Sequence, residues 1–210
     1  MKSSCCIKTF LFCILLLLCI TVHPDLSSSA VVPDTGVTSC FDDQGLEIVC
    51  PETGQPFHGQ DAHYGPGAMI LTSNGDGTIS DTNTTLMWEV KGIANGSPDP
   101  TNPNNPDNTY RWDELTTFVS LLNSTNYGGY SDWRIPTVKE LESLLDLSIA
   151  EPGPTTDMTL FPNCKAGSYW TSDLDIDNPA MAWSIDFSNS LDNITATSDL
   201  LYVRAVRGGL

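Results

Sequence analysis

One short run constrains the fold of this chain more than any other stretch. Residues 128–141 read GGYSDWRIPTVKEL. The adjacent glycines Gly128 and Gly129 allow a backbone turn that is closed to residues with a Cβ atom. Thr137, followed three positions later by Glu140, has the pattern of a capping box. The run therefore predicts a turn that leads into a helix beginning at Thr137.

An acid, an aromatic residue and a cation stand between this turn and the helix: Asp132, Trp133 and Arg134. A planar guanidinium beside carboxylates and an aromatic ring is a common structural clamp. We therefore predict that these three residues hold the loop onto the helix, whose cap is formed by Thr137 and Glu140. The alternative is that the same side chains contact a ligand.

Hydrophobic spacing predicts two central helices with strands on either side. Leu115, Phe118, Val119 and Leu122 recur at helical spacing, which predicts a helix over residues 112–123. The second helix is predicted over 138–147. Strands are predicted at 77–81, 86–90, 169–172, 181–188 and 200–206. Strands, two helices and strands again are typical of an α+β fold, with the helices packed on antiparallel strands.

The strand at 181–188 has the clearest alternation. Its predicted buried face carries Met181, Trp183, Ile185 and Phe187. Trp88, which follows two apolar residues, is likewise predicted to lie in the core.

The chain has the length and pattern of a single compact domain. Two segments rich in proline, residues 95–108 and 149–163, predict long Asn/Pro-rich loops rather than regular structure. No internal repeat is visible. We predict one domain over residues 31–210, with a hairpin extension at 31–66 and the core at 67–210.

Residues 1–30 have the composition of a secretory signal peptide. Lys2 and Lys8 supply the positive start, residues 9–22 the apolar stretch, and residues 28–30 a small-residue cleavage site. A lipoprotein signal at Cys19 is the alternative, but the residue before it is not small. The apolar stretch is too short for a membrane span. We therefore expect an exported protein that is periplasmic, at the cell surface or secreted.

Three of the seven cysteines, Cys40, Cys50 and Cys164, lie after the expected cleavage site. Cys40 and Cys50 flank a stretch with a turn at 43–45, which suits a disulfide across a small hairpin. Cys164 is then left as an inert free thiol. Because the sequence has neither a C-x-x-C motif nor a zinc-type Cys/His spacing, no metal–thiolate chemistry is expected.

The chain is strongly acidic. Its formal net charge is −17, and once Lys2, Lys8 and Asp25 are removed with the signal, seven basic and 25 acidic residues give −18. Nucleic acids and other polyanions are therefore excluded as expected partners, because they bind basic patches. A solvated acidic surface that keeps the protein soluble explains the same composition.

Asp173, Asp175 and Asp177 form an acidic cluster between two predicted strands. A loop there could direct its carboxylates at one hard cation, so these residues are the candidate ligands for calcium, the one cofactor that we consider. A solvated surface explains the cluster as well, and we favour it. We expect no enzyme activity, because the sequence contains no G-x-S-x-G elbow, H-E-x-x-H helix or phosphate-binding loop.

Residues 128–141 resemble the G-Y-x-D-W-R-x-P-[ST]-x-x-E-L signature of the Legionella collagen-like protein C-terminal domain family. The other segments that carry the resemblance are 50–51, 59–62, 75–78, 81–88, 169–172, 183–187 and 203–209. The order of elements is also similar to the layout of C-type-lectin-like and formylglycine-generating-enzyme-like proteins. In a member of the family, the domain sits on a trimeric adhesin that binds sulfated glycosaminoglycans.

The resemblance implies a surface-binding role and a homo-oligomer, a trimer by analogy. A net charge of −18 opposes a sulfated polysaccharide, so that specificity is not expected here. We expect an exported, non-enzymatic binding or adhesion module whose partner is an extracellular glycan or a surface protein. The alternative function is a calcium-assisted carbohydrate-binding protein or hydrolase.

Overall fold

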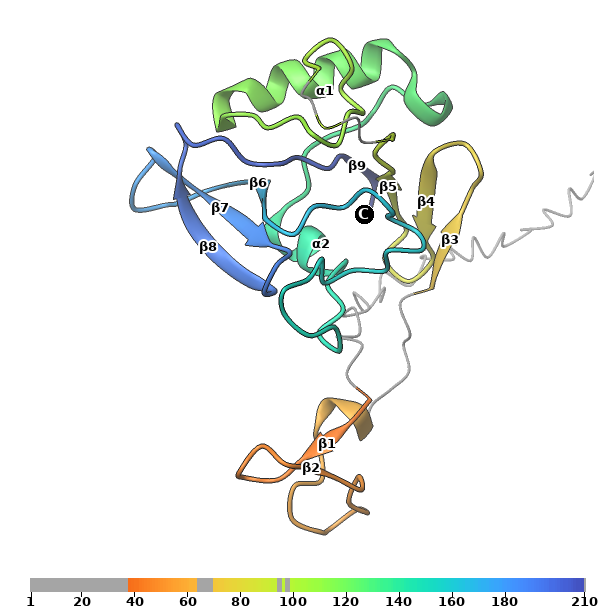
Figure 1. The fold of residues 1–210 in the computed structure, drawn as a ribbon, viewed down its shortest axis with the longest axis vertical. Coiled ribbons are helices and arrows are strands. Elements are labelled where there is room, and N and C mark those ends of the chain that lie inside the picture. The colour runs from red at the N-terminus through yellow and green to blue at the C-terminus, as the bar shows by residue number, and fades with distance from the viewer. Residues whose placement is uncertain (1–37, 64–69, 94–95, 97–98, 210) are drawn as a thin grey trace, which may run out of the picture.

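The computed structural model describes residues 38–63, 70–93, 96 and 99–209 (Figure 1). The expected signal peptide lies outside these residues. The fold is α+β, as predicted, and consists mostly of strands in three antiparallel sheets. None of the helices in the described part of the chain has the length and hydrophobicity that a membrane crossing requires.

A four-stranded sheet brings the end of the chain against its middle. It contains β3 (Leu71–Ser73), β4 (Thr78–Asp81), β5 (Leu86–Glu89) and β9 (Val206–Gly208), in that order. The turn between β3 and β4 contains Gly77, whose φ of 89° favours glycine. A Cβ atom there would also meet the Tyr127 hydroxyl at 2.5 Å. This turn and the ring of Tyr127 therefore fit each other only with glycine at position 77.

The second sheet is a meander of β6 (Ser168–Leu174), β7 (Met181–Asp186) and β8 (Leu191–Ala196). Strand β8 was not predicted, because it has no alternating apolar pattern and its first four residues are exposed. The burial of β7 also differs from the prediction. Ala182 and Ser184 are buried, whereas Trp183 is half-buried, because this sheet is covered on both faces along part of its length.

The first helical region begins with the 3₁₀ turn η2 (Trp112–Glu114) and continues as α1 (Leu115–Ser124). Leu115, Phe118 and Leu122 form its buried face. The helix ends before Asn126, whose φ is 49°, and the short 3₁₀ turn η3 (Tyr127–Gly129) follows. The predicted helix at 112–123 is therefore present, with a tighter first turn.

Helix α2 (Val138–Glu142) is shorter than the predicted 138–147. Beyond Glu142, the backbone N–H groups of Leu144 and Leu145 bond to carbonyls three residues back, so the ladder tightens and stops. Leu141, Leu144 and Leu145 are nevertheless buried, as the pattern predicted.

Two groups of buried side chains form the core. In the first group, side chains from α2 and from both sheets pack against Trp88 and Tyr169. In the second group, side chains from α1 pack against Trp133 and Trp170. Trp88 is fully buried, which confirms the prediction for this residue. Segment 201–205 passes between the two groups as irregular chain, so the strand predicted at 200–206 is wrong in position, and the regular strand is β9.

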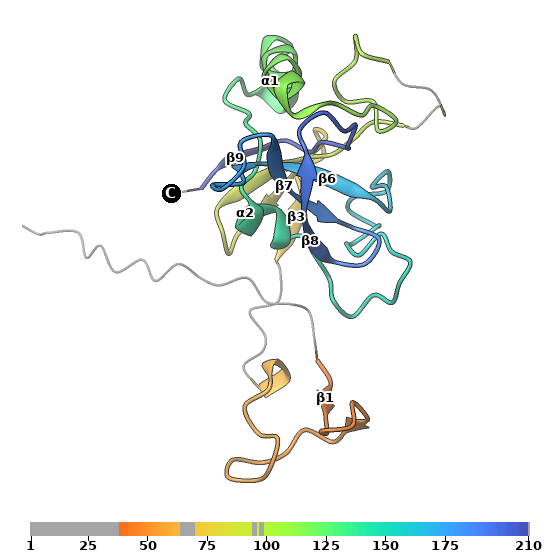
Figure 2. The same ribbon diagram turned by 90° about the vertical axis from the view of Figure 1, so that its left-hand side faces the viewer.

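Residues 38–63, which we call the hairpin unit, lie apart from the rest of the chain in both views (Figure 1, Figure 2). The unit consists of β1 (Cys40–Phe41), β2 (Glu47–Ile48) and the 3₁₀ turn η1 (Asp61–His63). Asp42 Oδ1 accepts the backbone N–H groups of Gln44 and Leu46 and so closes the turn between the two strands. The predicted disulfide between Cys40 and Cys50 is present.

Candidate functional site

The segment from Gly128 to Leu141 is held by an ion pair at the start of α2. Arg134 donates from Nη1 and Nη2 to the two oxygens of Glu140, at 2.7 and 2.6 Å. The capping box is formed: Glu140 Oε2 accepts the backbone N–H of Thr137, and Thr137 Oγ1 accepts that of Glu140. Arg134 Nη2 also donates to the carbonyl of Gly208 in β9. One guanidinium thus links the helix cap to the last strand.

The remaining residues of this segment also make structural contacts. Asp132 receives Nε and Nη2 of Arg207, at 2.7 and 3.1 Å, and the Arg207 guanidinium lies 3.7 Å from the centre of the Tyr130 ring. Trp133 is buried and donates from Nε1 to the carbonyl of Tyr127. Each of the predicted clamp residues therefore contacts the fold itself.

The pKa values at this clamp follow from its hydrogen bonds. Burial acts to raise the pKa of Glu140, but the bonds from Arg134 and Thr137 outweigh it and the pKa lies below its usual value. The hydrogen bond from Arg207 lowers the pKa of Asp132. Both carboxylates are therefore held in the charged form and are poor candidates for a general acid.

A buried cluster of charges lies deeper in the fold, and sequence reasoning missed it. Glu89 is fully buried at the end of β5, and its Oε1 accepts Lys91 Nζ at 2.8 Å. Glu89 Oε2 accepts the backbone N–H of Ala205. Burial lowers the pKa of Lys91, although the nearby carboxylate of Glu89 acts to raise it. The sequence carried one signal for this cluster: Glu89 lies within a predicted apolar strand, and Lys91 follows directly after that strand.

Arg204 completes this cluster. Its Nη1 donates to the carbonyl of Glu89 at 2.7 Å, and its guanidinium lies 4.4 Å from the centre of the Phe161 ring. Nε and Nη2 are buried without a hydrogen-bond partner among the described residues. The free thiol of Cys164 is buried nearby in the core and lies 3.5 Å from the Tyr169 hydroxyl.

The acidic residues that were candidates for calcium are not brought together. Asp173 lies in β6, where its Oδ2 accepts the backbone N–H of Val138 and caps α2. Asp175 Oδ1 accepts the backbone N–H of Asp177 in a local turn. Within the described part of the chain, these three carboxylates are not among the groups whose ligand atoms converge.

A surface pocket of about 460 Å³ opens beside the end of α2. Its walls combine carboxylates, a hydroxyl and apolar side chains: Asp146, Ile149, Pro152, Gly153, Pro154, Thr156, Asp157 and Met158. Asp146 and Asp157 are half-buried, whereas Thr156 is fully buried and its hydroxyl has no partner among the described residues. A pocket of this size is within the range of small-ligand sites.

The backbone of the pocket is fixed by the end of β7. Gly153 N–H donates to the carbonyl of Ser188, and Thr155 N–H donates to that of Phe187, at 2.9 and 2.8 Å. A Cβ atom at position 153 would collide with the Phe187 carbonyl, so only glycine allows this approach. The pocket is therefore formed by anchored backbone even though it lies in the predicted loop at 149–163.

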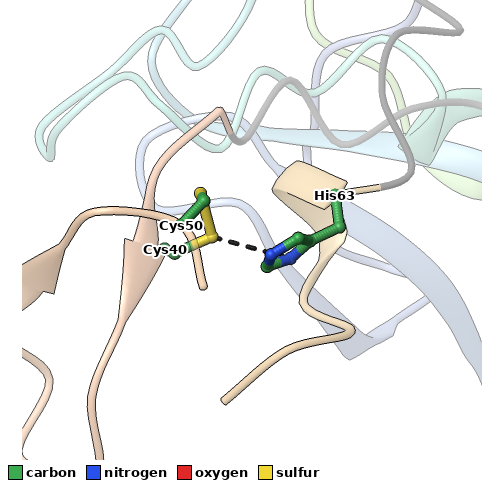
Figure 3. A group of neighbouring side chains, drawn as sticks. All are labelled: Cys40, Cys50 and His63. Atoms are coloured by element: carbon green, nitrogen blue, oxygen red, sulfur yellow. Dashed lines mark hydrogen bonds between the residues drawn. A yellow bond between two sulfur atoms is a disulfide. The ribbon is translucent and has the colours of Figure 1, made fainter. Parts of the chain in front are cut away.

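A third group of side chains lies in the hairpin unit (Figure 3). The ligand atoms of Cys40, Cys50 and His63 lie within 4.8 Å of one another. His63 Nδ1 is 3.7 Å from Cys40 Sγ, and Nε2 is 2.7 Å from the carbonyl oxygen of Pro51. This group could not be recognised from the sequence, because the spacing between the three residues matches no common zinc motif.

A comparison with known protein families identifies a relationship for this chain. No curated protein matches the chain. The family model of the Lcl C-terminal domain matches residues 77–207, which is more than half of the chain and includes the clamp, the buried charges and the pocket. The hairpin unit lies outside the matched region. The chain therefore belongs to the Lcl C-terminal domain family.

Proposed function

We propose that this protein is an exported, non-enzymatic binding module and that its ligand occupies the pocket beside α2. The observation that carries the proposal is the buried Thr156 hydroxyl, which has no partner among the described residues of a pocket of about 460 Å³. A buried hydroxyl without a partner costs about 1–3 kcal/mol. A ligand group that bonds to it recovers part of that free energy.

The two carboxylates of the pocket favour a neutral, hydroxyl-rich ligand. Asp146 Oδ1 accepts Ser148, and Asp157 Oδ1 accepts the backbone N–H of Thr159. The second oxygen of each carboxylate makes no hydrogen bond within the described residues and is left for a ligand. With a net charge of −17 for the chain, a polyanion is repelled. A neutral glycan supplies hydroxyl donors for the carboxylates and methine faces for Met158 and Ile149.

The proposal also includes the layout of the fold, export of the protein, the type of partner and the oligomeric state. A lectin-like or formylglycine-generating-enzyme-like layout fits a surface-binding role, as does export by a signal at residues 1–30. The partner is then an extracellular glycan or a glycosylated surface protein, and a homo-oligomer would add avidity to a weak site. Catalysis is not proposed, because the sequence contains no G-x-S-x-G elbow, H-E-x-x-H helix or phosphate-binding loop, and the carboxylates of the clamp are held in ion pairs.

A glycan and matrix-protein array, read with and without calcium, tests the proposal. We expect binding to neutral glycans that does not depend on calcium. Asp157→Asn and Thr156→Val should each weaken that binding by about tenfold, the effect of losing roughly one ligand hydrogen bond. Asp199→Asn, an exposed acid outside the pocket, is the matched control and should bind as the wild type does.

Two results contradict the proposal. Binding that survives both pocket substitutions places the ligand elsewhere. Reproducible hydrolysis of a glycan or glycan ester, abolished by replacement of one carboxylate, would make the protein an enzyme and overturn the non-enzymatic assignment.

A further inference from the structure

We propose that the hairpin unit is a redox-gated zinc site, in which Cys40, Cys50 and His63 bind one Zn²⁺ when the disulfide between the cysteines is reduced. Two thiolates and an imidazole are the ligand types that zinc prefers. The fourth position of the tetrahedron remains for water. The site lies outside residues 77–207 and is separate from the proposed glycan pocket.

The hairpin unit brings these three residues together through main-chain contacts. Gln60 bonds to both backbone groups of Phe41: its Oε1 accepts the N–H at 2.9 Å, and its Nε2 donates to the carbonyl at 2.7 Å. This pairing docks the turn η1 against β1. His63, at the end of η1, therefore faces Cys40 across a fixed distance (Figure 3).

The distance from His63 to Cys40 already fits a zinc site. With Zn–S near 2.3 Å and Zn–N near 2.05 Å, tetrahedral geometry separates the sulfur and nitrogen ligands by about 3.6 Å. The observed distance between Cys40 Sγ and His63 Nδ1 is 3.7 Å. Cys50 Sγ has to move after reduction, because two thiolates on zinc lie about 3.8 Å apart. It already lies within 4.8 Å of the other ligand atoms, so the required movement is small.

The hydrogen bond of the other ring nitrogen orients His63 as a ligand. The Pro51 carbonyl can only accept, so His63 Nε2, 2.7 Å away, carries the proton. In the neutral ring, Nδ1 then presents its lone pair toward Cys40. Metal-binding histidines commonly donate their second N–H to a backbone carbonyl in this way, which fixes both the tautomer and the ring orientation.

The redox step balances with an external dithiol as the reductant. The dithiol transfers two electrons and two protons to the disulfide, the bond between Cys40 and Cys50 breaks, and the dithiol becomes a cyclic disulfide. Zinc then replaces the protons of the two thiols, and both protons pass to solvent. Exchange with an external disulfide reverses the step. That disulfide takes up two electrons and two protons from solvent to become a dithiol, the bond between Cys40 and Cys50 forms again, and Zn²⁺ is released because sulfurs that are bonded to each other no longer act as thiolate ligands.

The composition of the hairpin unit explains why it needs a cross-link in either state. Phe41, Leu46, Val49 and Phe57 are exposed, and Cys40 is the only residue of the unit among the buried apolar side chains of the described chain. A unit this small cannot stabilise itself by hydrophobic burial and depends on a disulfide or a structural metal. Zinc and the disulfide are thus alternative cross-links at one place.

The test uses the chain from Val31, the form expected after export, reduced with a phosphine and desalted without oxygen. Titration with Zn²⁺ alone, and with Co²⁺ as a spectroscopic probe, should give one metal per chain with thiolate-to-cobalt absorption. Bound zinc should slow the alkylation of Cys40 and Cys50, resolved by peptide mass spectrometry, and should leave the alkylation rate of the buried Cys164 unchanged. The oxidised protein should bind neither metal with comparable affinity.

Variants separate the site from other thiols. His63→Ala should weaken zinc binding by more than the roughly 10–100-fold that loss of an orienting partner costs. Cys164→Ser, which changes the buried core thiol, is the control and should bind zinc as the wild type does. The proposal is overturned if zinc fails to protect Cys40 and Cys50, if His63→Ala binds as tightly as the wild type, or if the oxidised protein binds equally well.

Discussion

Replacing Glu89 with alanine tests the buried charge cluster most directly. The carboxylate of Glu89 accepts Lys91 Nζ, Asn104 Nδ2 and the backbone N–H of Ala205, at 2.8, 3.0 and 2.9 Å. Glu89 is 0% exposed, and the side chain of Lys91 is 5% exposed. Without this carboxylate, the ammonium of Lys91 and the guanidinium of Arg204 remain buried with no counter-ion between them.

Removing one partner of a buried ion pair costs about 3–5 kcal/mol. For a domain of this size, each kcal/mol shifts the melting temperature by about 2–4 °C, so Glu89→Ala should lower Tm by about 6–20 °C. Urea unfolding followed by tryptophan fluorescence gives the free energy. Asp199→Ala, which removes an exposed carboxylate, should change the free energy of unfolding by less than about 0.5 kcal/mol.

The pH dependence gives this prediction a second signature. Burial lowers the pKa of Lys91 from 10.5, and Glu89 opposes that shift. Between the folded and unfolded pKa values the unfolded chain binds more protons, so this contribution to stability rises with pH. Without Glu89 the pKa of Lys91 in the folded protein falls further. The loss of stability caused by Glu89→Ala should therefore become smaller as pH rises toward the ordinary lysine pKa of 10.5. A loss below about 1 kcal/mol, the size of an exposed ion pair, would refute the reasoning.

Four further predictions concern the clamp, the thiols and the pocket. Arg134→Ala should lower the free energy of unfolding by about 1–2 kcal/mol, because the ion pair with Glu140 is bidentate but the Arg134 side chain is 40% exposed. Arg134→Lys should recover part of the lost stability, because the ammonium keeps the charge but lacks the bidentate geometry. Equal stability of the wild type and both variants in urea would contradict the prediction. The pKa of Glu140 is lower in the folded than in the unfolded protein, so its carboxylate stabilises the fold above the unfolded pKa, and this contribution is lost as pH falls through the folded pKa. The free energy of unfolding, measured in urea at decreasing pH, should therefore fall less steeply for Arg134→Ala than for the wild type. The denatured, unreduced chain from Val31 should contain one alkylatable cysteine, Cys164, by mass spectrometry, whereas three would exclude the disulfide. Thr156→Val should raise the free energy of unfolding by up to about 1 kcal/mol, because it removes a buried hydroxyl with no partner among the described residues. If the free energy of unfolding measured in urea instead falls by a similar amount, that hydroxyl has a hydrogen-bond partner and the reasoning is wrong.

The parts of the fold that depend on nearby residues could be predicted from the sequence. The start of α2 at Val138 follows from Thr137 and Glu140, because a capping box is complete within one turn. The disulfide closes a short hairpin and is equally local. The Lcl C-terminal domain family could also be recognised, because its signature is concentrated in residues 128–141.

Features that depend on distant contacts could not be predicted. Residues 203–206 are all buried, so they lack the alternation by which a strand is recognised, and β9 begins only at Val206. Strand β8 is an edge strand with an exposed start, and such strands carry little apolar signal. The pairing of Arg204 with the carbonyl of Glu89, and the approach of His63 to Cys40, depend on tertiary structure and leave no spacing rule in the sequence.

The pairing of β9 with β5 also limits when this sheet can form during synthesis. Val206 pairs with Trp88, and its backbone exchanges hydrogen bonds with Arg134, so β9 completes contacts with two earlier parts of the chain. On the ribosome, the four-stranded sheet can therefore be completed only after residue 208 has left the exit tunnel. Deletion of residues 206–208 should leave the edge of β5 without this partner and the sheet incomplete.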